Sequence, residues 1–246
     1  MSQHVATDVA DGVFRIRLDR PDKKNALDRA MYGALAGALR AAEADDAVGC
    51  ILFLGAPGAF SAGNDIADFA ASAGAARPLD ELVDFLDTLA GAAKPMIAAV
   101  DGLAIGIGTT LLLHCDLVYA TPRSLFRTPF SDLGVVPEAA SSLLGPLALG
   151  HQRAFALLVM GETWSAEAAR EAGLVLAVGE DAEAEAETAA RRLAAKPREA
   201  VRIGRELLRT APDAVRERIA VEADLFADRL RSTEAQAAFA AFLKRG

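Results

Sequence analysis

The sequence predicts an α/β protein with a mostly parallel sheet, followed by a helical region at the C-terminus. Short apolar runs that are typical of buried strands alternate with longer segments of helical periodicity. Two of these runs lead into glycine-containing loops. Beyond residue 196 only helical patterns remain, so Lys196-Pro197 marks a predicted boundary between a core of residues 1–196 and a helical region of residues 197–246.

The composition fits one large globular unit and disfavours several classes of function. The chain has 246 residues, of which 52% are hydrophobic, so it can bury a sizeable core. A net charge of −8 disfavours nonspecific binding to nucleic acid. The N-terminus lacks a secretion signal, and no apolar run approaches the roughly 20 residues of a membrane helix. We therefore expect a cytoplasmic protein with no nucleic-acid or membrane partner.

The N-terminal part of the chain predicts a strand, a helix and a second strand. Residues 13–20, VFRIRLDR, alternate apolar and charged side chains, as a half-buried strand does. Asp28 is placed to cap the helix that follows. Residues 50–56, CILFLGA, form a continuous apolar run that is typical of a strand buried on both faces. Cys50 and Cys115 lie in apolar runs, which favours buried free thiols.

The middle of the chain predicts a helix, a buried strand and a second glycine-rich turn. Residues 69–81 are rich in small side chains, so we expect a mobile segment there. The helix that follows shows one apolar face, marked by Leu79, Leu82, Val83, Leu86 and Leu89. Residues 95–106, PMIAAVDGLAIG, predict a strand and a turn, and residues 107–120 predict a helix and then a strand.

The last third of the chain is mostly helical in pattern. Residues 174–178, LVLAV, predict one short final strand. Residues 181–196, DAEAEAETAARRLAAK, predict an exposed helix because alanine, glutamate and arginine dominate them. Residues 197–246 predict amphipathic helices.

Two glycine-containing loops follow predicted strands, at residues 60–66 (FSAGNDI) and 101–108 (DGLAIGIG). Glycine lets a backbone turn sharply and approach a ligand closely. Two such loops that meet would aim free N–H groups at one point and form an oxyanion hole. The alternative is that both are tight turns without a ligand. A dinucleotide-binding fingerprint is disfavoured, because Leu111 stands where the third glycine would be.

Several polar residues have structural as well as functional interpretations. Glu138 follows Pro137, a good first helical residue, so its carboxylate either favours the helix dipole or acts as a catalytic base. The other candidates are interpreted first as structural: Asp65 as a loop or cap residue, Asp116 as a loop tie, Asp132 as a surface turn residue and His114 as a core residue.

The chain resembles the crotonase superfamily, also called the enoyl-CoA hydratase/isomerase family. Its signatures match four segments in order, from about residue 10 to residue 180: RPDKKNAL, AFSAGNDI, AVDGLAIGIGTTLLLHCDLVYAT and SAEAAREAGLV. The resemblance implies a spiral of ββα turns with a helical C-terminal region used in trimer assembly. A homotrimer or hexamer is therefore expected.

The resemblance also implies a site for acyl-CoA thioesters. Family members stabilise an enolate oxyanion with two backbone N–H groups, and the matching donors are Asn64 and Ile107. The segments that contact CoA match Lys24, Asn25, Ala26, Ala62, Asp65 and Ile66. No metal and no cofactor are expected, because CoA is part of the substrate. Lys24, or a residue near Lys244 of a neighbouring subunit, is a candidate for the CoA phosphates.

The acidic residues separate the subfamilies. Hydratases carry two glutamates, at positions that match Thr110 and Phe130 here, and neither of these can transfer the required proton. Residues 126–142, FRTPFSDLGVVPEAASS, instead resemble the peroxisomal type of Δ3,Δ2-enoyl-CoA isomerase, which has a single glutamate where Glu138 stands. The resemblance thus implies an enzyme of fatty-acid β-oxidation that moves a double bond from C3 to C2, with Glu138 as the acid/base.

Other functions remain open at this stage. An enoyl-CoA hydratase, another crotonase reaction and a noncatalytic acyl-CoA-binding protein are the alternatives. We expect the acyl pocket to involve residues 69–89, with Leu82 and Phe85 as lining residues. The expected apolar neighbours of Glu138 are Phe126, Phe130 and Val136.

Overall fold

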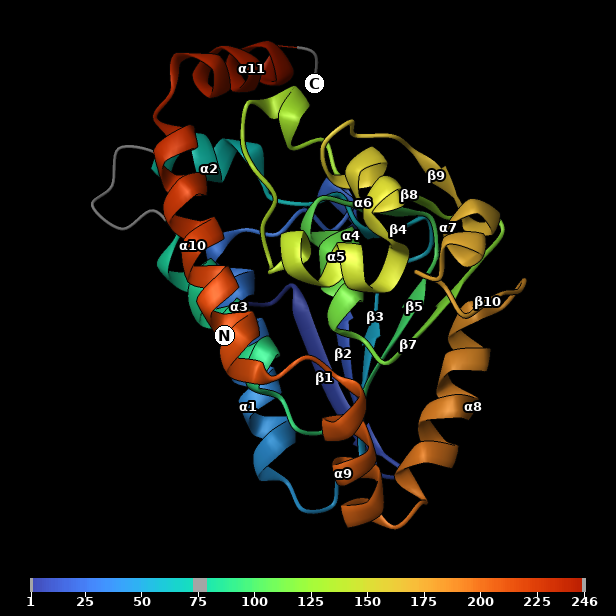
Figure 1. Ribbon diagram of the computed structural model, residues 1–246. Helices are drawn as coiled ribbons and strands as arrows, with labels where there is room; N and C mark the ends of the chain where they lie inside the picture. The colour runs from blue at the N-terminus through green and yellow to red at the C-terminus, as the bar shows by residue number, and fades with distance from the viewer. Residues whose placement is uncertain (1, 73–78, 245–246) are drawn as a thin grey trace.

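Two sheets form the centre of the computed structural model, which describes residues 2–72 and 79–244 (Figure 1). The larger sheet has six strands in the order β1-β2-β3-β5-β7-β10. These strands are β1 (Val5–Ala10), β2 (Val13–Leu18), β3 (Cys50–Leu54), β5 (Met96–Val100), β7 (Leu117–Ala120) and β10 (Ala177–Val178). All neighbours are parallel except β1 and β2, so the predicted α/β class with a mostly parallel sheet is confirmed.

The edge strand β1 was not predicted from the sequence. Nearly all of its residues are exposed, so it lacks the apolar alternation that marks β2. The hairpin that joins the two strands turns at Asp11 and Gly12, which both have positive φ. An Asp-Gly pair in this conformation is typical of two-residue hairpins, and it was the signal available in the sequence.

The smaller sheet has four strands in the order β4-β6-β8-β9. They are β4 (Ala59–Ser61), β6 (Leu103–Ile105), β8 (Leu125–Arg127) and β9 (Trp164–Ser165). Strands β3, β5 and β7 of the larger sheet are each followed along the chain by one strand of the smaller sheet. After β4 comes α2 (Ile66–Ser72), and after β6 comes α4 (Ile107–Thr110), which continues as η2 (Leu111–His114). This repeat produces the predicted ββα spiral.

Helices cover both faces of the larger sheet. On one face lie α1 (Arg29–Ala44) and α3 (Asp80–Gly91), and on the other lies α8 (Ala182–Ala194) (Figure 1). The Asp28 carboxylate accepts a hydrogen bond from the Met31 N–H at 2.9 Å, so the predicted cap of α1 is confirmed. All residues of β3 and β5 are buried, as predicted for strands covered on both faces.

Helix α8 was predicted to be exposed, and this was wrong for one of its faces. Ala182, Ala186 and Ala190 recur every four residues and are buried against the sheet. Alanine stripes are weak hydrophobic signals, so the many charged residues between them masked the buried face.

The helices after β8 complete the chain. They are η3 (Ser131–Leu133), α5 (Ser141–Leu149), α6 (His151–Leu158) and α7 (Ala166–Ala172) before α8, and α9 (Arg198–Leu208), α10 (Pro212–Leu230) and α11 (Thr233–Leu243) after it. In the described part of the chain, no helix combines the length and the apolar character needed to cross a bilayer.

The C-terminal helices pack on the core of their own chain. Helix α10 runs along α3, and α11 lies near α2 (Figure 1). The ring of Phe226 on α10 meets Phe69 on α2 edge-on, with 6.2 Å between the centroids. The helical character predicted for the C-terminal region is confirmed for its described residues, up to residue 244. These helices build part of the interior of their own chain, and their use in assembly stays a prediction.

Candidate active site

The two glycine-rich loops lie against each other, as the oxyanion-hole hypothesis requires. Gly63 has a φ of +91°, and a Cβ atom there would lie 3.0 Å from the carbonyl oxygen of Ile105. Gly106 has a φ of +55°, and a Cβ atom on it would lie 3.8 Å from the Cα of Gly63. Glycine is thus required by both the backbone conformation and the close approach at Gly63.

The amides of Asn64 and Ile107 are left free where these loops meet. Leu27 pairs with the backbone around Asn64: its N–H donates to the Gly63 carbonyl at 2.8 Å, and its carbonyl accepts from Asp65 at 2.9 Å. Ile107 is the first residue of α4, so its N–H has no intrahelical acceptor. Among the described residues, no backbone carbonyl accepts a hydrogen bond from either amide. Both can therefore donate to an anionic ligand atom.

Glu138 contributes a buried carboxylate to the site. It lies in the loop before α5, which begins at Ser141, so the interpretation of Glu138 as a first-turn helix residue was wrong. Its exposed fraction is 3%, and neither carboxylate oxygen has a hydrogen-bond partner among the described residues. The Asn64 side chain lies close enough to affect the pKa of Glu138, but its geometry is not that of an ordinary hydrogen bond.

The surroundings favour the neutral form of this carboxyl group. Burial raises the pKa of Glu138 from the ordinary value of 4.5 to about 8. The amide of Asn64 opposes this rise in pKa, and the negative charge of Glu222 adds to it. A carboxyl group with a pKa near neutrality can both accept and return a proton at working pH.

The backbone that carries Glu138 turns through an unusual conformation. Ala139 and Ala140 both have positive φ, at 62° and 53°, and Ser141 N–H closes the turn on the Glu138 carbonyl at 3.1 Å. Such turns normally use glycine, asparagine or aspartate. Nε2 of His114 lies 2.7 Å from the Ala139 carbonyl and therefore donates to it. Burial lowers the pKa of His114 to about 4, so the ring is neutral. Its predicted role as a satisfied core residue is confirmed.

A small cavity adjoins Glu138. Its volume is about 10 Å³, room for about one water molecule. Besides Glu138 and Ala139, its lining residues come from or adjoin two helices: Leu79, Leu82, Val83 and Leu86 at α3, and Ile219, Glu222, Ala223 and Phe226 on α10. A larger cavity of about 660 Å³ lies between η2, α5 and α9, and neither Glu138 nor the two free amides line it.

The residues that line the small cavity at Glu138 differ in part from the prediction. Leu82 lines it as predicted, whereas Phe85 packs on Tyr32, with 5.7 Å between the ring centroids. None of the described lining residues is Phe126, Phe130 or Val136. Within the segment 69–89, residues up to Ser72 and from Asp80 onward are helical, and residues 73–78 lie outside the described part.

Sequence reasoning missed the contribution of α10. The buried positions of this helix are Val215, Ile219, Glu222, Phe226 and Leu230. Their spacing places a carboxylate on an otherwise apolar helix face, and this was the available signal. Glu222 is buried, and burial raises its pKa, whereas hydrogen bonds from Ser142 lower it.

Tyr32 was missed as well. Its buried hydroxyl donates to the Oδ1 atom of Asn64. Burial, and then the negative charge of Glu138, raise the pKa of Tyr32 well above its ordinary value. The phenol therefore stays protonated and acts as a donor. The Tyr32 hydroxyl thus contacts the Asn64 side chain, which in turn lies near the Glu138 carboxylate.

The residues matched to the CoA-binding segments come together around the paired backbone of Leu27 and Asn64. Lys24, Asn25 and Ala26 form one side, and Ala62 joins them through its N–H, which donates to the Lys24 carbonyl at 2.9 Å. Lys24 is exposed. Ile66 begins α2 on the other side of the bridge.

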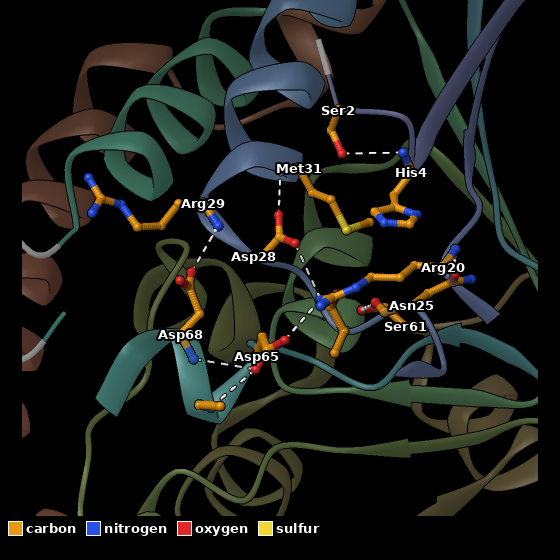
Figure 2. Close-up of polar contacts among 12 residues, drawn as sticks. Ser2, His4, Arg20, Asn25, Asp28, Arg29, Met31, Ser61, Asp65 and Asp68 are labelled. Carbon is orange, nitrogen blue, oxygen red and sulfur yellow. Dashed lines mark hydrogen bonds and ion pairs between the residues drawn. The ribbon is translucent and has the colours of Figure 1, made fainter. Parts of the chain in front are cut away.

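Two of these side chains hold the loops themselves. The amide of Asn25 is buried and donates to the carbonyls of Ala59 and Phe60, at 2.9 and 3.2 Å. Asp65 pairs with Arg20 at 2.9 Å and accepts from the first N–H groups of α2. Figure 2 shows the Arg20 guanidinium between Asp65 and Asp28. The structural interpretation of Asp65 is confirmed.

The other acidic residues keep their structural interpretations. Asp132 is an exposed residue of η3 and pairs with Arg127. Asp116 accepts from the Met96 N–H at 2.7 Å and pairs with Arg205. Cys50 and Cys115 are free thiols. Within the described residues, no group of three or more His, Cys, Asp or Glu side chains is arranged to hold a metal ion.

Known proteins are similar in sequence to most of this chain. Residues 8–246 match the family model described as Enoyl-CoA hydratase/isomerase. Enoyl-CoA delta isomerase 2 of Rattus norvegicus is 38% identical over 205 residues, which cover 80% of this chain and 52% of the relative. The chain thus spans about half the length of that relative. The 1,2-epoxyphenylacetyl-CoA isomerase of Escherichia coli is 36% identical over 206 residues, which cover 80% of this chain and 78% of the relative.

A solved structure extends the similarity to the full fold. The structure of Pseudomonas aeruginosa OdaA is 43% identical in sequence, with a TM-score of 0.91, and the match covers 98% of this chain and 99% of that chain. The family model and this structure both include the C-terminal helices. The chain belongs to the enoyl-CoA hydratase/isomerase family.

Proposed function

We propose that the protein is an acyl-CoA isomerase that moves a double bond from C3 to C2 of an enoyl-CoA, with Glu138 as its acid/base. The observation that carries this proposal is the buried, unpartnered carboxylate of Glu138, whose pKa of about 8 suits proton transfer. The free amides of Asn64 and Ile107 supply the second requirement, a pair of donors for an oxyanion.

The reaction needs one proton to leave C2 and one to arrive at C4. The Glu138 carboxylate takes the C2 proton, and the electron pair of that C–H bond moves into the thioester carbonyl. The resulting dienolate oxygen accepts hydrogen bonds from Asn64 and Ile107. Glu138 then gives the proton to C4 as the electrons return from the enolate, so that C2 and C3 share the double bond. The carboxylate is regenerated, and no other reactant is consumed.

The names of the two relatives agree with chemistry of this class. Both are described as isomerases, one of enoyl-CoA and one of 1,2-epoxyphenylacetyl-CoA. For this chain we place the CoA moiety along Lys24, Ala26, Ala62 and Ile66, because they surround the backbone bridge next to Asn64.

Hydration of trans-2-enoyl-CoA is the second candidate function. The two positions of the hydratase glutamates hold Thr110 and Phe130, both buried and neither able to transfer a proton. Glu222, however, lines the same cavity as Glu138 and has one buried oxygen without a partner among the described residues. With two carboxylates at one cavity, one can activate the water while the other manages the proton at the α-carbon.

Isomerisation and hydration are separated by assays with two substrates. Wild type and Glu138→Gln receive 3-hexenoyl-CoA and trans-2-hexenoyl-CoA, and the two products are followed separately. Asp132→Asn is the matched control, because it removes an exposed acid from the same segment. We expect isomerisation in wild type and in the control, and its loss in Glu138→Gln. Full isomerase activity in a folded Glu138→Gln protein would refute the proposal.

The pH dependence gives an independent check of the same assignment. Since the base is the ionised form and the pKa of Glu138 is about 8, kcat/KM for isomerisation should rise with pH and level off above that value. Hydration as the main reaction, dependent on both Glu138 and Glu222, would favour the second candidate.

A further inference from the structure

We propose that His114 and Glu222 are positioning residues that clamp the left-handed turn at Ala139–Ala140 and thereby hold Glu138 at the cavity. Their positioning role rests on the function proposed above, whereas the clamp is a property of the fold alone. The two residues lie on different elements, η2 and α10, and both are buried. Neither is needed for proton transfer in the proposed reaction.

The turn requires an external constraint. Ala139 and Ala140 follow one another with φ values of 62° and 53°, a conformation that L-residues with a Cβ atom disfavour. Both side chains are fully or almost fully buried, so no solvent contact compensates. The backbone keeps this conformation only if the surrounding contacts impose it. A relaxed turn would change the direction in which the Glu138 side chain leaves the backbone.

His114 supplies one constraint. Its neutral ring donates from Nε2 to the Ala139 carbonyl at 2.7 Å. That carbonyl belongs to the first left-handed residue, directly after Glu138. The hydrogen bond therefore fixes the peptide plane that joins Ala139 to Ala140.

Glu222 supplies the other constraint, from the C-terminal helix. Helix α5 starts after Ala140, whose side chain has no oxygen that could cap the free N–H groups. Oε1 of Glu222 takes this place: it accepts from Ser142 N–H at 2.9 Å and from Ser142 Oγ at 2.5 Å. The guanidinium of Arg218, one turn earlier on α10, also donates to Ser142 Oγ, at 3.1 Å.

Glu222 faces the catalytic cavity at the same time. Its Oε2 atom is buried without a partner among the described residues, and the residue lines the cavity together with Glu138. Glu222 therefore acts on Glu138 in two ways: it holds the turn through Oε1, and it places a negative charge near the base. The first effect is mechanical and the second electrostatic, so two substitutions can separate them.

The experiment compares four variants of the full chain with wild type. Glu222→Leu removes both effects, Glu222→Gln keeps the acceptor but removes the charge, and His114→Ala removes the other half of the clamp. Glu217→Leu is the matched control, because Glu217 is an exposed glutamate on the same helix. Amide hydrogen exchange of residues 139–142 is measured without substrate, and kcat and KM are measured with 3-hexenoyl-CoA.

The clamp predicts a specific combination of results. Glu222→Leu and His114→Ala should exchange the amides of residues 139–142 faster and lose about 10²-fold in kcat while KM stays similar, because the base is misplaced. Glu222→Gln should keep slow exchange, and its pH profile should move to lower pH. That variant leaves Asn64 and Tyr32, the other groups near Glu138, unchanged. It also leaves Arg218, which donates to Ser142, unchanged. Glu217→Leu should match wild type.

Other results would overturn the inference. Wild-type exchange and kcat in both Glu222→Leu and His114→Ala would show that the turn needs no clamp. If Glu222→Leu does not fold, His114→Ala and Glu222→Gln decide: fast exchange only in the former supports the clamp, and wild-type exchange in both refutes it. If wild type does not isomerise 3-hexenoyl-CoA, the proposed function fails, and the exchange data still decide whether the clamp exists.

Discussion

The Glu138 carboxylate is buried in a place that opposes its ionisation. A buried carboxylate without hydrogen bonds normally becomes neutral or finds a positive partner. Among the described residues, the charged group that affects its pKa is Glu222, which is also negative. Such an arrangement lowers the stability of the fold and suits a group that must hold and release a proton.

Replacing this residue should therefore stabilise the protein at alkaline pH. The difference between a pKa of about 8 in the folded chain and the ordinary 4.5 corresponds to roughly 5 kcal/mol at most. The folded-state pKa is the higher one, so the stability contributed by this carboxyl group is fully present below about 4.5 and is lost as pH rises through about 8. Glu138→Gln has no such loss.

Urea unfolding of both proteins between pH 5 and 9 measures the difference. The stability gap in favour of Glu138→Gln should widen with pH and then level off. Parallel stability curves would contradict the assignment of the raised pKa to Glu138. Asp132→Asn again serves as control, because Asp132 is exposed.

The Tyr32 hydroxyl is a second single group whose removal can be tested. Tyr32→Phe keeps the ring that packs on Phe85 and removes only the hydroxyl that donates to Asn64. We expect a loss of about 1 kcal/mol in the free energy of unfolding, because the partly buried Oδ1 acceptor of Asn64 loses its partner. The kcat of isomerisation should fall as well, since the Asn64 side chain is free to rotate away from Glu138. An unchanged kcat would show that the phenol only fills space.

Which of these residues the sequence reveals depends on how local their signal is. Asn64, Ile107 and Glu138 lie within short motifs, so their positions could be predicted before the structure. Tyr32 and Glu222 act through contacts with residues far away in the chain, so no short motif assigns them a role, although the helical spacing of its neighbours marks Glu222 as a buried position. For Asn25 the sequence identifies the motif but not the role of the side chain. Only the structure shows that this side chain holds β4 through hydrogen bonds.

At the scale of elements, α3 and α10 together line the cavity next to Glu138. The cavity between them and Glu138 is about 10 Å³, which is too small for the acyl chain of the proposed substrate. The sequence predicted the buried face of α3 because leucines at helical spacing are a strong signal. It missed the matching face of α10 because Glu222 interrupts the apolar pattern.

Enlarging this cavity should change stability and specificity together. Leu86 on α3 is buried and lines the cavity, so Leu86→Ala should cost about 2–5 kcal/mol of stability. The space gained should shift the ratio of kcat/KM values toward longer or branched acyl chains. Leu207→Ala is the control, because Leu207 on α9 is 81% exposed. A lost stability without any change in chain preference would place the acyl chain elsewhere.

At the scale of the whole molecule, the C-terminal region is joined to the core by polar contacts as well as apolar packing. The guanidinium of Arg205 on α9 is buried and donates to Asp116 and to the Ala92 carbonyl. Arg209 donates to the carbonyls of Ala90 and Ala92, each at 2.6 Å. These donors meet carbonyls at the C-terminal end of α3, which would otherwise lack partners in the interior.

The predicted boundary at Lys196-Pro197 should therefore not separate two independently stable units. A chain that ends at residue 196 loses the buried side chains of Ile219, Phe226 and Leu230. Each such side chain contributes roughly 1.5–3 kcal/mol, and their sum is a large part of the 5–15 kcal/mol that stabilises a typical domain. We expect this chain to lose cooperative urea unfolding and near-ultraviolet circular dichroism.

A second truncation tests whether the effect comes from α9 and α10 or from any loss of C-terminal residues. A chain that ends at Leu230 keeps both helices and the Glu222 contacts with Ser142, and loses α11, in which Ala235 and Phe239 are the buried residues. It should unfold cooperatively at a lower urea concentration and retain isomerase activity. Cooperative unfolding of the 196-residue chain would instead show that the core is stable alone and that the C-terminal helices serve the site and the assembly only.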